Sequence, residues 1–353
     1  MMRLDLGRKQ TDRKLEELEK KIRRVYVEAE KDLKVKLDDY FRRFEAKDKI
    51  KRDQLKRGMI TASEYRQWRI GQIAVGKRWQ DMLDNVSADL ANTTRIAKSI
   101  ANGYRAEVYA INMNYATYDI EHRLKVDTSF ALYNREAVEQ IIRDEPELLP
   151  PPGPQMRRKL ASGVAVRWEK GQIQSVVTQA IIQGESVPNM ATRVAHTLCV
   201  SDRKAAVRYA RTAITGAENA GRLDSFYRME GMGIKVKKTW LAVLDSRTRD
   251  AHRELDGVTI PLDQPFENSI GKIMKPGDPS ADSANLWNCR CTMVSSLEGF
   301  ETDWTDMRLR NTKKLGDMSY DEWKKAHGKS QDILTPDKVA AVMRGRYARE
   351  YRR

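Results

Sequence analysis

The chain has 353 residues, of which 40% are hydrophobic and 33% are charged. This composition is polar for a globular protein but too apolar for a wholly disordered one, and the length allows two or three domains of ordinary size. The 65 lysines and arginines outnumber the 50 aspartates and glutamates, and the formal charge of +15 favours polyanionic partners, nucleic acid first and acidic protein or lipid surfaces next. The alternative interpretation is that these charges simply solvate exposed helix faces.

The three cysteines are too few for a disulfide framework and favour a reducing compartment. No apolar run approaches the roughly 18 residues of a membrane-spanning helix. The first residues, MMRLDLGRKQTDRK, contain no apolar stretch of signal-peptide length. We therefore expect a soluble protein that remains in the compartment where it is made.

The first predicted element is a long helix over residues 11–56, where apolar residues recur at every third or fourth position. These positions are Leu15, Leu18, Ile22, Val25, Ala29, Leu33, Leu37, Tyr40 and Phe44. The steps resemble those of a coiled coil with one stutter, so this helix should present a single apolar seam. Thr11 or Asp12 is expected to cap its start, and Gly58 suits the left-handed residue just past its end.

A second helix should begin after Thr61, which is expected to form a capping box with Glu64. Helical spacing then continues, with interruptions, to about Leu124. Residues 1–145 are therefore predicted to form a long-helix N-terminal module. Its apolar seam either packs on itself, which we favour, or serves a partner, including self-association with a second copy of the chain.

A proline-rich segment interrupts this helical pattern. The sequence EPELLPPPGPQ, residues 145–155, contains five prolines and one glycine. Proline is excluded from helix interiors and favours an extended, semi-rigid connector. We therefore place a linker at residues 146–155, between the N-terminal module and a second domain at residues 156–300.

The second domain is predicted to begin with three helices. The first covers about residues 164–183, and a short one follows with Ser186 as its cap. The third should start at Ser201 or Asp202, both good capping residues, and run to about Glu230.

The pattern then changes to that of strands. Alternation over residues 234–241 predicts one strand, and the segments GVTIPL and CRCTMV predict two more, separated by the loop KPGDPSADSAN. The predicted fold class is thus mainly α with an α+β domain. A long-helix N-terminal module comes first, then helices packed on a small antiparallel sheet, then a polar basic tail.

Residues 301–353 form the predicted polar, basic C-terminal tail. Its last ten residues contain five arginines, which are Arg344, Arg346, Arg349, Arg352 and Arg353. Two tyrosines accompany them against a single glutamate. Because arginine supplies charge and tyrosine a stacking face, this end is a candidate contact for nucleic acid or an acidic surface. The alternative is a frayed, solvated terminus.

The densest polar chemistry lies in the second domain, before the last predicted strand. Cys289 and Cys291 offer two thiolates and His252 offers an imidazole, which together make three ligands for a structural zinc ion. Asp245 or Asp256 is the candidate fourth ligand. Zinc is the one cofactor that the sequence suggests.

The histidine lies in the segment LDSRTRDAHRELDG, which follows the first predicted strand. Arg249 and His252 are three residues apart, and so are Arg253 and Asp256. Each pair is therefore expected to share one face of a helical turn.

Three other interpretations of the two cysteines stay open. Residues i and i+2 of a strand lie about 6.5–7 Å apart, at or beyond the usual disulfide limit, which disfavours a bond between them. A cysteine nucleophile would need His252 within hydrogen-bond reach and a further group that orients the histidine. Otherwise the cysteines pack as small apolar residues, while His252, Asn288 and the arginines form a hydrogen-bonded network that joins loop to strand.

Four segments occur in a recognisable order: ARTAITGAENAG, KKTWLAVLDSRTRDAHRELDGVTIPLDQPF, MKPGDPSADSAN and NCRC. This series resembles the head-morphogenesis domain of tailed bacteriophages, the family of minor head proteins typified by the Mu F protein and the SPP1 minor capsid protein. The matching positions are Arg211, Thr212, Trp240, Asp245, Arg247, Thr248, Arg249, His252, Leu255, Asp256, Gly257, Phe266, Pro276, Gly277, Asp278, Asn288, Cys289, Arg290 and Cys291.

The chain departs from the family pattern at one position. The family commonly has an acidic residue after the Arg-Thr pair, whereas this chain has Ala213, and the next carboxylate is Glu218. Because an acidic group that mattered chemically would be missing, the departure argues against catalysis. The segment KRGMITASEYRQW of the N-terminal module also resembles the helical leader that precedes this domain in phage minor capsid proteins.

The resemblance implies a structural, non-enzymatic minor head protein that assists head assembly, DNA packaging or DNA delivery. Its expected partners are the portal protein, the major capsid protein or scaffold, and packaged double-stranded DNA, in the virion and, during assembly, in the host cytoplasm. One alternative is an enzyme, a hydrolase or ribosyltransferase, that uses His252, Cys289 and Cys291. The other is a general DNA-binding protein.

Overall fold

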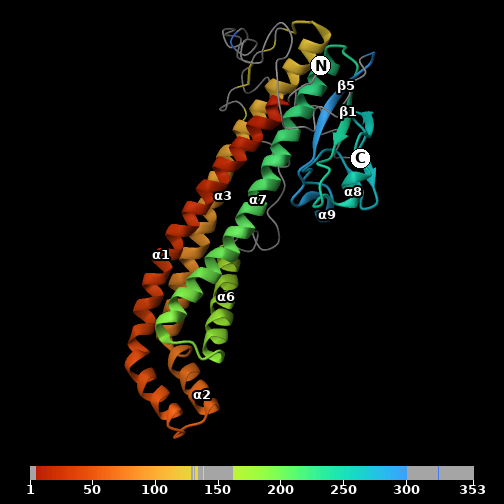
Figure 1. Cartoon of the computed structure of the whole chain (residues 1–353). Coiled ribbons are helices and arrows are strands. Elements are labelled where there is room, and N and C mark those ends of the chain that lie inside the picture. The colour runs from red at the N-terminus through yellow and green to blue at the C-terminus, as the bar shows by residue number, and fades with distance from the viewer. Residues whose placement is uncertain are drawn as a thin grey trace. The chain divides into compact units, whose positions relative to one another are not determined.

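The computed structural model describes residues 5–128, 130, 132–133, 138, 162–299 and 325. The helices are α1 (Leu6–Lys56), α2 (Ala62–Ile73), α3 (Lys77–Leu124), α6 (Ser162–Ile182), α7 (Val187–Gly231), α8 (Asp250–Arg253) and α9 (Ser283–Leu286). The strands are β1 (Val236–Leu241), β2 (Thr259–Pro261), β3 (Phe266–Asn268), β4 (Gly271–Ile273) and β5 (Thr292–Leu297). The predicted fold class, mainly α with a small antiparallel sheet in the C-terminal part, is confirmed (Figure 1).

The chain divides into two compact units. The sheet unit comprises the described residues within Met1–Leu18, Ala101–Pro151 and Arg208–Arg353, and the helical unit comprises those within Glu19–Ile100 and Pro152–Val207. The predicted linker at residues 146–155 and the five arginines from Arg344 to Arg353 lie outside the described residues, so the predicted domain limits stay predictions. No helix in the described ranges is both long and apolar enough to cross a bilayer.

The apolar seam predicted in α1 is buried within the chain itself. In the helical unit the buried seam positions are Ile22, Tyr26, Leu33, Leu37, Tyr40 and Phe41. Val25 and Phe44, predicted to lie in the seam, are half-buried, whereas Tyr26 and Phe41 are buried. The buried positions depart from the regular spacing because the 3.6-residue turn of a straight helix drifts against steps of three and four.

The predicted cap of α1 is wrong, and two other predicted caps are confirmed. The helix begins at Leu6, and Asp5 caps it by accepting a hydrogen bond of 2.9 Å from the amide of Arg8. Thr11 lies inside the helix, where its hydroxyl donates to the Gly7 carbonyl. Past the helix end Gly58 has a φ of 70°. The capping box of α2 forms as predicted. The Thr61 hydroxyl accepts a hydrogen bond from the Glu64 amide, and the Glu64 carboxylate accepts one from the Thr61 amide.

One predicted interruption is absent from the structure. The chain forms the continuous helix α7 from Val187 to Gly231, with no break at Ser201 or Asp202. A capping residue inside a helix costs less than about 0.7 kcal/mol relative to alanine. The apolar spacing continues across the site, with Leu198, Cys199, Ala205 and Ala206 all buried. Burial of this face therefore outweighs the local preference to start a new helix.

The sheet of the sheet unit has the strand order β2-β1-β5, with both pairings antiparallel. In its register Trp240 of β1 lies opposite Met293 of β5. A hairpin of β3 and β4, which the sequence did not predict, turns at Asn268, whose side chain accepts from the amides of Ile270 and Gly271. The strand predicted for CRCTMV lies three residues later in the chain, because β5 starts at Thr292 and the cysteines lie just before it.

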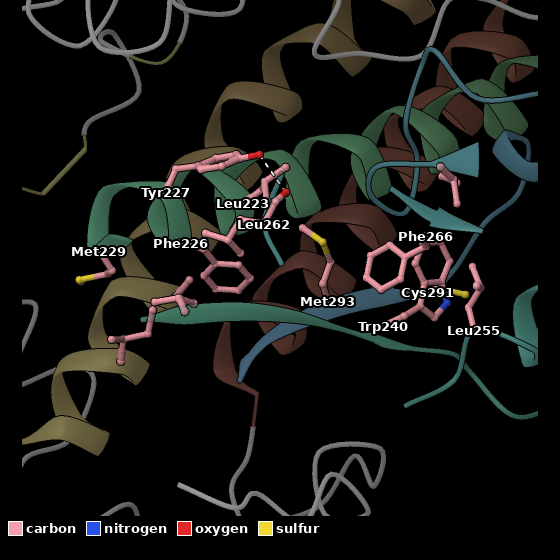
Figure 2. Close-up of a cluster of buried hydrophobic side chains, with 14 of the residues drawn as sticks. Leu223, Phe226, Tyr227, Met229, Trp240, Leu255, Leu262, Phe266, Cys291 and Met293 are labelled. Atoms are coloured by element: carbon pink, nitrogen blue, oxygen red, sulfur yellow. Dashed lines mark hydrogen bonds between the residues drawn. The ribbon is translucent and has the colours of Figure 1, made fainter. Parts of the chain in front are cut away.

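The core of the sheet unit is built around Trp240, which is fully buried (Figure 2). The indole ring meets the ring of Phe266 edge-on at a centroid distance of 5.2 Å, and that of His252 at 5.6 Å. Met293 and Cys291 lie beside these rings, and α7 closes the same core with Phe226. The motif tryptophan therefore joins the sheet, the histidine and the cysteine segment in one packed core.

Candidate functional site

A row of polar side chains on α7 holds the segment that carries the cysteines. Thr212, Thr215, Asn219 and Arg222, here called the polar ladder, are spaced by three, four and three residues and so lie on one helix face. At its first step the amide of Asn288 donates to the Thr212 hydroxyl at 3.1 Å. At the second, the Thr215 hydroxyl donates to the Cys289 carbonyl at 3.0 Å.

Asn219 makes the third step with both ends of its amide group. Its Nδ2 donates to the Cys291 carbonyl at 3.3 Å, and its Oδ1 accepts from the Met293 amide at 2.9 Å. Arg222 makes the fourth step, donating to the Met293 carbonyl at 3.3 Å. The polar ladder thus replaces the strand neighbour that this backbone lacks on the side of α7, and it fixes the position of both cysteines.

Arg222 is also the centre of a buried charge cluster. It pairs with Asp5 at 2.8 Å and lies 3.4 Å from Glu218, and all three side chains are buried. Burial by itself would raise the pKa of Asp5, but the charge of Arg222 and its hydrogen bonds outweigh this and hold that pKa below its ordinary value. Burial raises the pKa of Glu218. The start of α1 is therefore held by charge to α7, which carries the polar ladder.

Backbone geometry explains the residue type at two further motif positions, Asn288 and Gly277. Asn288 adopts a left-handed φ of 58°, which asparagine tolerates better than most residues. Gly277 has a φ of 75°, and a β-carbon there would lie 2.6 Å from the Gly216 amide nitrogen of α7. Asp278 then fixes this loop by accepting from the Met274 and Ser280 amides, both at 2.9 Å. Glycine is required because the loop backbone contacts the helix backbone directly.

Asp245 organises the turn that leads to the histidine. Its carboxylate accepts from the amide of Arg247 at 3.0 Å and from the hydroxyl of Thr248 at 3.1 Å. Arg290, between the two cysteines, binds the same carboxylate with two hydrogen bonds of 2.7 and 2.6 Å. This bidentate contact holds the pKa of Asp245 well below its ordinary value. The residue between the cysteines therefore connects their segment to the turn.

The predicted three-residue cluster comes together in the structure. His252 lies on α8, and the side chains of His252, Cys289 and Cys291 are only 2–3% exposed. The Nδ1 atom of His252 lies 3.7 Å from the Cys289 sulfur and 3.4 Å from the Cys291 sulfur. All three ligand atoms lie within 4.8 Å of one another. The cysteines form no disulfide.

The two thiols differ in acidity. A hydrogen bond with Cys289 and the nearby His252 lower the pKa of Cys291 well below its ordinary value, although burial opposes this. The same contact, together with burial, raises the pKa of Cys289.

The two candidate fourth ligands have other partners. Asp245 binds Arg290, and Asp256 accepts from the Ala242 amide at 3.0 Å. Arg253, expected to share a face with Asp256, instead donates to Asp250 and to the Asp245 carbonyl. Among the described residues the ligand cluster therefore contains two thiols and one imidazole.

Arg249 lies behind the histidine, as its spacing from His252 predicts. Its Nη1 lies 3.4 Å from His252 Nε2 and 3.5 Å from the Asn285 carbonyl, and its Nη2 donates to the Trp287 carbonyl. The arginine thereby ties α8 to the end of α9. Of the other motif residues, Gly257 takes a left-handed turn with a φ of 77°, and Arg211 is exposed on α7.

Sequence reasoning missed most of the polar ladder. Thr215, Asn219 and Arg222 lie on the same face as the predicted Thr212, in a helix otherwise rich in buried alanine. Polar residues that repeat every three or four positions on an apolar helix face are the signal that would have found them. Ala213, at the position where an acidic residue was expected, is fully buried.

Comparison with known proteins shows which family this arrangement resembles. Residues 171–294 match the family described as Phage Mu protein F like protein. The match contains the polar ladder, α8 with His252 and both clustered cysteines. Over these residues the chain is similar to this family. No solved structure matches it.

Curated relatives fall into different functional classes. The minor head protein GP7 of Bacillus phage SPP1 is 23% identical over 90% of this chain and 95% of its own length. The NAD(+)--arginine ADP-ribosyltransferase EFV of Enterococcus faecalis is 26% identical over 70% of this chain, which spans only 49% of that protein. An uncharacterised protein of Haemophilus influenzae is 24% identical, and 57% of its length is matched.

Proposed function

We propose that this protein is a structural minor head protein of a tailed phage. In this role it associates with the portal and the inner capsid, together with the major capsid protein or scaffold, and assists head assembly, DNA packaging or DNA delivery. The observation that carries the proposal is the match to the SPP1 minor head protein over 95% of that protein's length. A match along nearly the whole chain supports a shared role better than a shared domain does.

The burial of the cluster supports a role without catalysis. His252, Cys289 and Cys291 are 2–3% exposed and lie in the packed core around Trp240. A catalytic residue has to reach its substrate within hydrogen-bond distance. The polar ladder and the Asp245–Arg290 contact engage the surrounding polar groups in structural bonds.

Particle association tests the proposed role. The chain would be expressed with the portal, scaffold and major capsid proteins of the same phage, and particles would be separated on a density gradient. We expect the chain to sediment with procapsids in few copies. Recovery of the chain only in the soluble fractions at the top of the gradient, while procapsids form normally, would contradict the proposal.

An enzymatic role is the second candidate, because one relative is named an arginine ADP-ribosyltransferase. The test is transfer of label from NAD⁺ to an arginine substrate, or release of nicotinamide, by the purified chain. We expect no turnover above the blank. Turnover that disappears in a folded His252→Ala, Cys291→Ala double variant would support the enzyme instead.

A further inference from the structure

We propose that His252, Cys289 and Cys291 bind one zinc ion, with a water molecule as the fourth ligand. The first argument is the distance between the ligand atoms. A tetrahedral zinc ion holds sulfur at about 2.3 Å and nitrogen at about 2.0–2.1 Å, which sets the nitrogen and sulfur ligands about 3.6 Å apart. The two observed nitrogen–sulfur distances are 3.7 and 3.4 Å.

The second argument is that the ligands are already held in place. The side chains of Thr215 and Asn219 donate hydrogen bonds to the carbonyls of Cys289 and Cys291. The Asp245–Arg290 contact fixes the residue between the two cysteines. The histidine lies on α8 with its ring packed against Trp240. A site with ligands fixed by neighbouring contacts binds its metal without an ordering cost in the folded chain.

The third argument concerns the choice of ion. Two thiolates and one imidazole form a soft donor set, which suits zinc and disfavours magnesium or calcium. Two thiolates also neutralise a divalent ion, so the occupied centre adds no net charge to the core. Because Asp245 and Asp256 bind Arg290 and the Ala242 amide, we assign the fourth position to water. The burial of all three protein ligands gives the ion a structural role.

The proposal requires one change at the histidine. Zinc bound to Nδ1 leaves the proton on Nε2, and the guanidinium of Arg249, 3.4 Å away, cannot accept a hydrogen bond from it. Arg249 therefore moves off Nε2 in the occupied site and keeps its bonds to the carbonyls of Asn285 and Trp287. Without metal, Arg249 donates to Nε2 and the Nδ1 proton points to the sulfur atoms.

X-ray absorption at the zinc edge tests the ligand set without any mutation. The full-length protein would be purified under reducing conditions without chelator, incubated with zinc chloride, desalted and analysed for metal. We expect one zinc per chain, with two sulfur atoms at about 2.3 Å and two nitrogen or oxygen atoms at about 2.0–2.1 Å. Zinc far below one per chain, or a spectrum without sulfur, would overturn the proposal.

Cysteine variants locate the ion in the chain. Cys289→Ser and Cys291→Ser should each lose the bound zinc, whereas Cys199→Ser, a change at another buried cysteine, should keep it. Zinc retained by both site variants, or lost from Cys199→Ser, would place the ion elsewhere. If the site variants fold poorly, ¹⁵N NMR of the unmodified chain decides: zinc should move the His252 proton from Nδ1 to Nε2, and an unchanged tautomer counts against the site.

Discussion

At the scale of single residues, Asn219 is the side chain that contributes most directly to the shape of the site. Its amide group satisfies the Cys291 carbonyl and the Met293 amide, and it is fully buried. The contact spans the point where the cysteine segment becomes β5. No other residue of the polar ladder binds the backbone on both sides of this point.

Replacing Asn219 with alanine should therefore destabilise the protein strongly. The change leaves one buried acceptor and one buried donor without a partner, at about 1–3 kcal/mol for each. Urea unfolding followed by tryptophan fluorescence measures the loss. The matched control is Asn189→Ala, a change at an exposed asparagine of the same helix, which should cost little. Equal losses in the two variants would show that the polar ladder contributes no special stability.

The ion pair of Asp5 should make the stability of the folded protein depend on pH in the acidic range. The pKa of Asp5 is lowered in the folded protein, so its contribution is fully present above the ordinary value of 3.8 and is lost as the pH falls below it. Asp5→Asn removes the ion pair with Arg222 and should cost on the order of 3 kcal/mol near neutral pH. The difference in melting temperature between this variant and the unmodified protein should narrow as the pH falls below about 4.

A matched variant keeps this experiment interpretable. Asp39→Asn, a change at an exposed carboxylate of α1, serves as the control and should show no narrowing. A gap for Asp5→Asn that stays constant with pH would mean that the carboxylate is not held ionised by Arg222.

At the scale of whole elements, the backbones of α3 and α7 approach so closely at Gly221 that no side chain fits between them. A β-carbon at Gly221 of α7 would lie 2.4 Å from the carbonyl oxygen of Tyr109 on α3. Gly221→Ala should push the two backbones apart and cost about 1–3 kcal/mol, measured by thermal unfolding. Gly171→Ala on α6, where nothing lies within 4 Å, should instead be neutral or stabilising by up to about 1 kcal/mol.

The elements also show how far the sequence can be read. Apolar spacing predicted α1, α2 and α3, because a long buried seam is a repeated local signal. It failed at Ser201, where a capping preference was overruled by continued burial, and at the β3–β4 hairpin, whose strands have three residues each. Strands this short carry too few alternating positions to be recognised.

The three residues of the ligand cluster could be predicted from the sequence, whereas the polar ladder that holds them could not. His252, Cys289 and Cys291 are the residue types that carry chemistry, so they were found by inspection, and the structure brings them together. The polar ladder was missed because threonine and asparagine in a helix have no chemistry of their own to reveal them. Their role depends on a segment some 70 residues later in the chain, and that separation is set by tertiary packing.

At the scale of the whole molecule, the contacts within the described residues do not account for the excess of positive charge. The formal charge of +15 would favour packaged DNA, and the five arginines from Arg344 to Arg353 are the proposed contact. Replacing all five with glutamine should weaken binding to double-stranded DNA. The slope of log affinity against log salt concentration should also become shallower, by roughly 0.9 for each phosphate that the chain no longer neutralises.

A control with the same change in charge separates a local contact from general attraction. Five exposed cations of α1 would be replaced with glutamine instead, namely Lys20, Arg23, Arg24, Lys34 and Lys47. A contact made by the C-terminal arginines predicts that only the first variant shows a shallower slope, because counterions are released where phosphates are bound. Equal changes of slope would show a diffuse charge effect, and no retention on DNA at low salt would exclude DNA as a partner.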